Sequence, residues 1–167
     1  MVGIVPWGSG DHALLVGLLG DPAMMEHLGG PETAEKIAER QARYEQLSDC
    51  FKIVFEGKDA GWVGFWERDH HGETVYEMGW SVLPAFQGRG IASQATKLAL
   101  DAARAAEGPR FVHASPSVDN EASNAVCRKA GFELLEEYET EYPPGTPLRV
   151  NDWCFDLRPA EGPAPAR

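Results

Sequence analysis

A strand that leads through a glycine-rich turn into a helix constrains this chain more than any other feature. Residues 76–83 are rich in aromatic and branched side chains and predict a strand, which Pro84 ends because proline cannot donate to a β-ladder. A helix is predicted from about residue 90 to 107, since apolar residues recur at spacings of three and four. These are Ile91, Ala95, Leu98, Ala102 and Ala106. The turn between strand and helix leaves free backbone N–H groups at a helix N-terminus, so it predicts an anion site, best suited to a phosphate or pyrophosphate.

Two common phosphate loops do not fit this turn. A P-loop has Lys and then Ser or Thr after its last glycine, whereas here Gly90 precedes Ile91 and Ala92. A dinucleotide fold needs a third glycine, where this chain has Ser93, and an acidic residue about twenty positions further on. The remaining structural alternative is a glycine turn that only closes a strand–helix corner.

Two motifs together carry a family resemblance. The pattern Gln87-x-x-Gly90-x-Ala92 resembles the acetyl-CoA pyrophosphate loop of the GCN5-related N-acetyltransferases, the GNAT family. A later segment, residues 120–132, resembles the second signature of the same family, and a strand is predicted between the two at residues 110–114. The second motif reads Asn120-x-x-Ser123-x-x-Val126-Cys127-x-Lys129-x-Gly131-Phe132. The resemblance covers roughly residues 11–157, and residues 27–33 and 77–78 are similar to the RimJ/RimL-like branch, which acetylates N-terminal amines of ribosomal proteins.

The resemblance implies an α/β (α+β) fold with a mixed, mostly antiparallel sheet. About six or seven strands would be splayed at the centre and flanked by about four or five helices. Patterns along the chain agree, with strands expected at residues 2–5, 51–55, 61–67, 74–83, 110–114, 132–142 and 149–157. Helices are expected at residues 11–19, 33–47, 90–107 and 121–130, with a short helical turn at 22–28. We expect a single GNAT domain at residues 1–157 and a Pro/Ala-rich tail at 158–167.

Acetyl-CoA is the acyl donor that the resemblance implies. Its pyrophosphate would lie on the glycine loop, and its pantetheine arm would enter between the splayed strands and bond free backbone groups of the central one. Asn120 would face the arm or the reaction centre, or act as a plain helix cap. The predicted cofactor-binding residues are Ser81, Val82, Leu83, Gln87, Gly88, Arg89, Gly90, Ile91, Ala92 and Asn120.

The catalytic candidates are Glu77, Asn120 and Cys127. An alkylammonium has a pKa near 10.4, so an attacking amine needs a base at neutral pH. Glu77 is the candidate base because it interrupts an otherwise apolar strand; the alternative is a solvated or salt-bridged glutamate. Many family members carry a tyrosine as general acid where this chain has Cys127. A buried helix cysteine is usually inert, so Ser115 or Ser123 through water, or unassisted departure of the thiolate, are equal alternatives.

Composition limits the partners. A net charge of −11 argues against nucleic acid and favours a cationic partner, although solubility alone explains an acidic surface. The three cysteines and five histidines show no metal-site spacing, so we expect no metal, and an odd cysteine count fits the cytoplasm. His113 is expected to be a satisfied core or edge histidine and His70 a solvated loop residue. No membrane span or leader is apparent, and dimers among relatives make a homodimer an open alternative.

The predicted function is N-acetyl transfer from acetyl-CoA to the primary amine of a small molecule or a protein N-terminus. The main rival is an acyl-CoA-binding sensor or structural module without turnover, which the missing tyrosine at Cys127 keeps open. A nucleotide-binding regulatory domain is a third interpretation and would prefer ATP or NAD to CoA.

Overall fold

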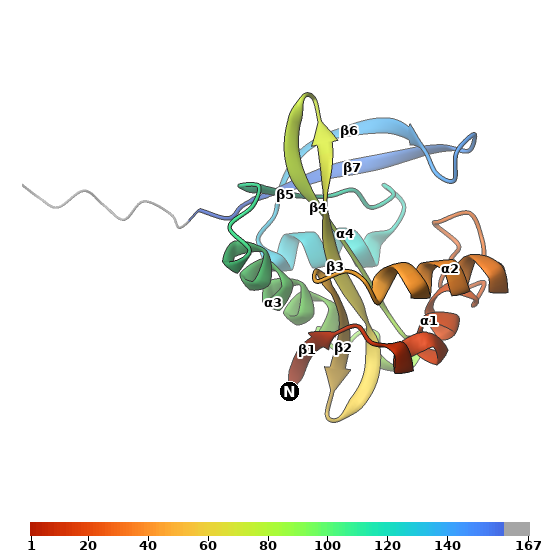
Figure 1. Cartoon of the computed structure of the whole chain (residues 1–167). Helices are drawn as coiled ribbons and strands as arrows, with labels where there is room; N and C mark the ends of the chain where they lie inside the picture. Colours follow the sequence, from red (N-terminus) through yellow and green to blue (C-terminus); the bar gives the residue numbers. More distant parts are fainter. Residues whose placement is uncertain (159–167) are drawn as a thin grey trace, which may run out of the picture.

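A computed structural model describes residues 1–158 of the 167-residue chain as a sheet flanked by helices (Figure 1). The seven strands follow the order β1-β2-β3-β4-β5-β7-β6 across the sheet. Their bounds are Val2–Pro6 (β1), Cys50–Phe55 (β2), Lys58–His70 (β3), Glu73–Val82 (β4), Phe111–Ala114 (β5), Glu133–Glu141 (β6) and Pro147–Asp156 (β7). The α-helices are His12–Leu19 (α1), Ala34–Tyr44 (α2), Ile91–Ala105 (α3) and Glu121–Ala130 (α4), and 3₁₀-helices span Ser9–Asp11 and Pro84–Phe86. The predicted fold class is therefore confirmed within the described residues, and the tail expected at 158–167 lies almost wholly outside them.

The sheet is splayed at its centre. β2, β3 and β4 form the expected antiparallel meander, whereas β4 and β5 are parallel. The β4–β5 ladder has only two residue pairs, Tyr76 with Val112 and Glu77 with His113. Within residues 1–158, the rest of β4 up to Val82 therefore has no strand on its β5 side, and that edge can take another partner.

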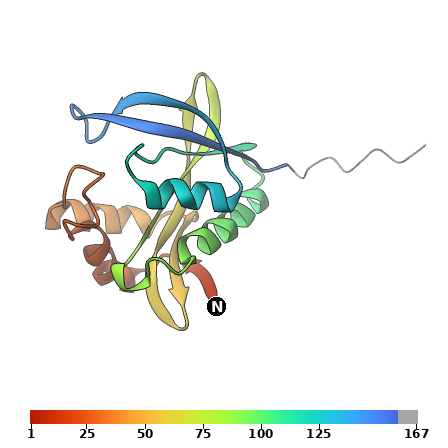
Figure 2. The same cartoon turned by 180° about the vertical axis from the view of Figure 1, so that it is seen from behind.

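Two cores cover the two faces of the sheet. α3 and α4 lie in front of the sheet in Figure 2, which views the molecule from behind. α1 and α2 pack against the opposite face, which is nearer the viewer in Figure 1. The predicted apolar stripe of α3 is partly wrong, because Leu98 and Ala106 are exposed. The buried residues of α3 instead include a row at four-residue spacing: Ile91, Ala95, Ala99 and Ala103. The three alanines of this row are small, so they let the helix approach the sheet closely.

The segment between α1 and α2 departs from the prediction. The short helical turn expected at residues 22–28 is a series of turns without a helix. The Asp21 carboxylate accepts hydrogen bonds from the backbone N–H groups of Ala23 and Met24, and Gly29 and Gly30 both have positive φ, so the chain does not continue into a helix. Thr33 caps α2 as predicted, accepting from the Lys36 N–H at 3.3 Å.

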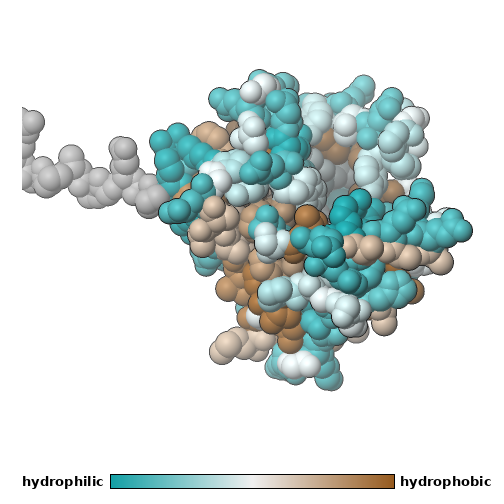
Figure 3. Space-filling view, viewed as in Figure 1, coloured by the Kyte–Doolittle hydropathy of each residue, from teal (hydrophilic) through white to brown (hydrophobic). Residues whose placement is uncertain are grey.

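The β6–β7 hairpin carries a charged edge strand. β6 is exposed along most of its length and is rich in glutamate, and Figure 3 shows hydrophilic side chains over this upper part of the molecule. Charged side chains on an edge strand oppose pairing with another sheet. Among the described helices, we find none with the length and apolar character that a membrane crossing requires.

Candidate active site

A cleft of about 1570 Å³ opens where β4 and β5 diverge. Its walls come from β4, the N-terminal ends of α3 and α4, the turns after α1, and β6. This volume exceeds that of an ordinary single-ligand pocket, about 300–1000 Å³, so the cleft has room for two reactants at once.

The glycine loop forms one end of the cleft. Gly88 and Gly90 both have φ of +73°, the left-handed region that side chains rarely adopt, and both line the cleft. A Cβ on Gly88 would meet nothing within 4 Å, and one on Gly90 would meet only the Gln94 amide at 3.7 Å. α3 begins directly afterwards at Ile91, so the loop presents unobstructed backbone N–H groups together with the positive end of a helix.

Two side chains of this loop, those of Gln87 and Arg89, already have contacts within the protein, although Gln87 also lines the cleft. The Gln87 amide donates to the Val82 carbonyl at 2.9 Å and so ties the loop to the end of β4. The Arg89 guanidinium lies over the Phe55 ring, 5.2 Å from its centroid, and Arg89 is not among the cleft-lining residues. Of these two predicted cofactor residues, Arg89 can contribute only its backbone.

Only some of the residues predicted to bind the pantetheine arm have backbone groups on the free edge of β4. The Leu83 N–H already donates to the Ala60 carbonyl of β3 at 2.8 Å. Backbone groups of successive strand residues point to opposite edges, so Leu83 and Ser81 face β3, and Trp80 and Val82 face the open side. The prediction for Ser81 and Leu83 is corrected accordingly: of the three residues 81–83, only Val82 offers its backbone N–H to the cleft.

Asn120 caps α4 and also borders the cleft. Its side-chain oxygen accepts from the Ser123 N–H at 3.1 Å, as a helix cap does. Asn124, which the sequence analysis did not single out, is buried and donates to the Asn120 and Ser117 carbonyls. Its oxygen accepts from the Trp153 indole at 2.8 Å, so Asn124 fixes the start of α4 against β7.

A partly buried ion pair lines the cleft. Arg68 on β3 donates to the Glu77 carboxylate at 2.6 Å, and the Glu77 side chain is only 12 % exposed. Burial raises the pKa of the Glu77 carboxyl above its ordinary value, and the positive charge of Arg68 opposes this rise. The Arg68 Nη2 is buried and, within the described chain, has no hydrogen-bond partner. Two hydroxyls, of Ser115 and Tyr138, lie 3.3 Å apart in the same cleft.

An aromatic wall lies between this ion pair and α2. The Trp62 ring stacks on Tyr44 with centroids 5.4 Å apart and on Trp66 at 6.4 Å. Gly79 makes room for this stack, because a Cβ there would come within 3.2 Å of both tryptophans. No sequence pattern indicates this wall, because its members come from α2 and β3 and meet only in the fold.

Cys127 lies outside the cleft. Its side chain is fully buried in the core that α3 and α4 share, and it is absent from the cleft lining. Burial raises the pKa of its thiol to about 12. A thiol in this position has no path to a departing thiolate, so the geometry argues against Cys127 as general acid.

A free strand edge and a glycine loop at a helix N-terminus therefore meet in one cleft. The chain belongs to the GNAT acetyltransferase family, because residues 2–133 match the family model described as "Acetyltransferase (GNAT) domain". Among the curated proteins, no match was found.

Solved structures share this fold at low sequence identity. A GNAT-family acetyltransferase from Bacillus anthracis has a TM-score of 0.80 at 19% identity, over 93% of this chain and 95% of that chain. An acetyl transferase from Salmonella typhimurium that modifies the N-terminal serine of a 50S ribosomal subunit protein gives 0.76 at 22%, over 93% and 94%. A spermidine N-acetyltransferase from Vibrio cholerae, in complex with CoA and spermine, gives 0.77 at 16%, over 93% and 95%.

Proposed function

We propose that this protein transfers the acetyl group of acetyl-CoA to a primary amine by direct attack within a ternary complex. One observation carries the proposal: a single cleft joins the glycine loop, the free edge of β4 and the partly buried carboxylate of Glu77. Each supplies a different requirement of the reaction, namely phosphate binding, placement of the thioester and removal of a proton.

The donor half would be held by backbone groups. The N–H groups of residues 87–92 would bind the pyrophosphate, and the pantetheine arm would lie along the open edge of β4. The Val82 N–H would then face the thioester carbonyl and stabilise the oxyanion that forms on attack. The Gln87 amide supports this geometry by holding the Val82 carbonyl.

Glu77 would act as the general base. Its raised pKa brings the carboxylate closer in basicity to the amine that it must deprotonate, and its pairing with Arg68 keeps it ionised near neutral pH. The thiolate of CoA is a good leaving group, since a thiol has a pKa of about 8.5. The hydroxyls of Ser115 and Tyr138 are candidates to return a proton to it.

The acceptor half favours an amine with a carbonyl group next to it. The unpartnered Nη2 of Arg68 offers a donor beside Glu77, and the faces of Trp62 and Trp66 can attract a cationic chain. A protein N-terminus or an amino acid derivative satisfies both features, whereas a polyamine leaves Arg68 unpaired. This supports the RimJ/RimL-like branch as the specific proposal, with a small-molecule amine as the alternative.

A CoA-binding module without turnover is the second candidate. It is favoured by Cys127, which stands where many GNAT members have a tyrosine and is buried away from the cleft. This candidate predicts acetyl-CoA binding without cleavage of the thioester.

One experiment separates these functions. Acetyl-CoA is titrated by calorimetry, and free thiol is then measured with peptides carrying a free N-terminal serine, the same peptides blocked at the N-terminus, spermidine and an aminoglycoside. Thiol release with the free peptide but not the blocked one supports the specific proposal, and release only with spermidine or the aminoglycoside moves the acceptor to small amines. Acetyl-CoA binding without thiol release supports the CoA-binding module. No acetyl-CoA binding refutes all three functions: acetylation of a protein N-terminus, acetylation of a small amine and the CoA-binding module.

A further inference from the structure

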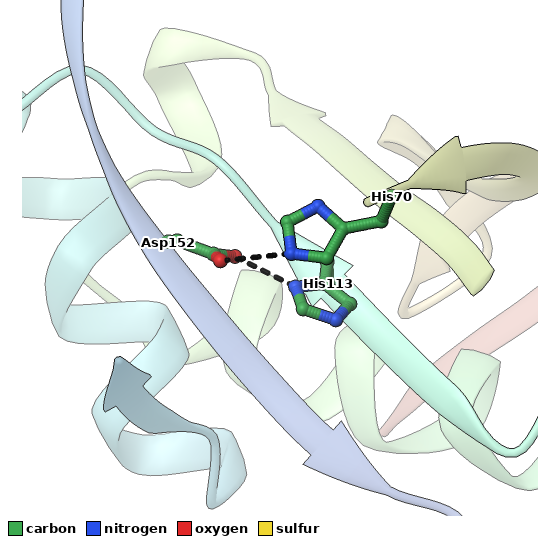
Figure 4. A group of neighbouring side chains, drawn as sticks. All are labelled: His70, His113 and Asp152. Carbon is green, nitrogen blue, oxygen red and sulfur yellow. Dashed lines mark hydrogen bonds and ion pairs between the residues drawn. The ribbon is translucent and has the colours of Figure 1, made fainter. Parts of the chain in front are cut away.

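Three polar side chains meet at the end of the β3–β4 hairpin, outside the acetyl-CoA cleft. Figure 4 shows the carboxylate of Asp152 directed at nitrogen atoms of His70 and His113. The His113 Nδ1 lies 2.7 Å from one carboxylate oxygen, and the His70 Nε2 lies 3.4 Å from the other. The two imidazole rings lie face to face at a tilt, with centroids 4.2 Å apart.

The cluster is rigid and largely buried. Its members come from three strands, β3, β5 and β7, whose backbone pairing holds each side chain in place. The side chains of Asp152 and His113 are 1% and 5% exposed, and that of His70 is 17% exposed. Solvent therefore reaches the group mainly past His70, and the Asp152 carboxylate itself is almost completely shielded from solvent.

The donor set is one that proteins use for transition metals. One ligand atom from each residue lies within 4.8 Å of the other two, so small side-chain movements would bring all three within the bonds of about 2.0–2.2 Å that zinc makes with nitrogen and oxygen. Two imidazole nitrogens suit zinc, cobalt or nickel, whereas magnesium and calcium prefer sites made of oxygen atoms. A buried carboxylate also needs a cation beside it, either a protonated imidazole or a metal ion.

We propose that His70, His113 and Asp152 form a binding site for a divalent transition metal, with Zn²⁺ as the expected ion. Three protein ligands leave one tetrahedral position, which a water molecule would fill from the exposed side of His70. The ion would join the tip of the β3–β4 hairpin to β5 and β7. None of the three residues lines the cleft, so the role of the ion is to stabilise the fold.

The test uses the full-length chain without a polyhistidine tag, stripped of metal by a chelator. Zn²⁺ and Mg²⁺ are titrated separately by calorimetry, and Co²⁺ is added to record its visible absorption. We expect one Zn²⁺ per chain at micromolar Kd or tighter, no Mg²⁺ binding, a visible Co²⁺ spectrum of a low-coordinate site, and a rise in Tm of about 5 °C at saturating Zn²⁺.

The variants distinguish this site from a surface histidine pair. His70→Ala and Asp152→Asn are expected to weaken Zn²⁺ binding at least about 100-fold and to remove the Tm rise, because losing a direct ligand should cost at least as much as the roughly 10–100-fold loss caused by changing an outer-shell partner. His71→Ala is the matched control, because His71 is exposed and its ring only packs against His70 at 4.5 Å; it should bind Zn²⁺ as the wild type does. Since His70 is partly exposed, His70→Ala should fold, and its circular dichroism verifies this.

Four results would overturn the proposal. The first is no Zn²⁺ binding by the stripped wild type, which would leave the cluster as an ion-paired histidine–aspartate network. The second is equal binding by wild type and folded His70→Ala. The third is loss of binding in His71→Ala, which would place the ion at the surface pair. The fourth is Mg²⁺ binding as tight as Zn²⁺ binding.

Discussion

The proposed donor half and the proposed acceptor half of the cleft use different parts of the chain. The donor half consists of backbone: the glycine loop and the open edge of β4, with φ of +73° at Gly88 and Gly90 as its most specific feature. The acceptor half consists of side chains: the Arg68–Glu77 pair and the stacked rings of Trp62 and Trp66. A backbone site needs glycines at fixed spacing in one stretch of sequence, whereas a side-chain site can be assembled from any elements that the fold brings together. The donor half is therefore local and the acceptor half is not.

The largest expected effect comes from placing charge in the backbone half. Gly90→Glu forces a side chain onto a left-handed residue and puts a carboxylate where the pyrophosphate would lie. Losing two or so charge-assisted hydrogen bonds and adding repulsion should weaken acetyl-CoA binding roughly 1000-fold, about 4 kcal/mol, by calorimetry.

A matched glycine isolates the cause of that loss. Gly72 has φ of +86° and open space around it, as Gly90 nearly does, but lies in the β3–β4 turn away from the cleft. Gly72→Glu should bind acetyl-CoA normally, and Gly90→Ala should lose much less affinity than Gly90→Glu. Normal affinity in Gly90→Glu would show that the loop is not the anion site.

The next effect tests the side-chain half alone. Glu77→Gln removes the proposed base but keeps its shape, so kcat should fall roughly 100-fold, the lower end of general-base contributions, while acetyl-CoA affinity stays unchanged. The measurement is thiol release with a saturating amine. Glu73→Gln, at the exposed start of the same strand, is the control and should retain full activity. Equal activity in Glu77→Gln would make Glu77 structural.

This division explains what the sequence could predict. Strand alternation, helix caps and glycine turns are local, so the strands, Asn120 as a cap and the loop could be placed from sequence. The register that turns Ser81 toward β3 depends on a hydrogen bond between Leu83 and Ala60, which no local pattern encodes. The burial of Cys127 depends on how α4 rotates against α3, and that too is decided by packing.

Short metal-ligand spacings could not have indicated the proposed metal site, for the same reason. His70, His113 and Asp152 are separated by about forty residues at each step, and only the sheet order brings β3, β5 and β7 together at that point. A search for short histidine and cysteine spacings finds sites on one helix or one hairpin, so it misses a site shared by three distant strands.

A smaller effect concerns the pH dependence of the side-chain half. Glu77 must be ionised to act as base, burial raises its pKa, and Arg68 lowers it. Arg68→Met should therefore raise that pKa further and move the acidic limb of kcat/KM to higher pH, so the loss of activity is larger at pH 6 than at pH 9. Arg149→Met is the control, because Arg149 pairs with Glu137 on the exposed hairpin and should leave the profile in place. An acidic limb of kcat/KM that is unchanged or moves to lower pH in Arg68→Met would contradict the assignment of Glu77 as the general base.

The smallest expected effect comes from a residue that belongs to neither half. Cys127→Ala should keep kcat within about twofold, because a thiol that is fully buried and has its pKa raised to about 12 cannot reach the leaving group. The same substitution should lower the free energy of unfolding by about 1–2 kcal/mol, since it leaves a small cavity in the core between α3 and α4. Denaturant unfolding and thiol release on the same preparation separate the two quantities. A large fall in kcat without a change in acetyl-CoA affinity would instead give Cys127 a catalytic role and show that the cleft opens toward α4 during turnover.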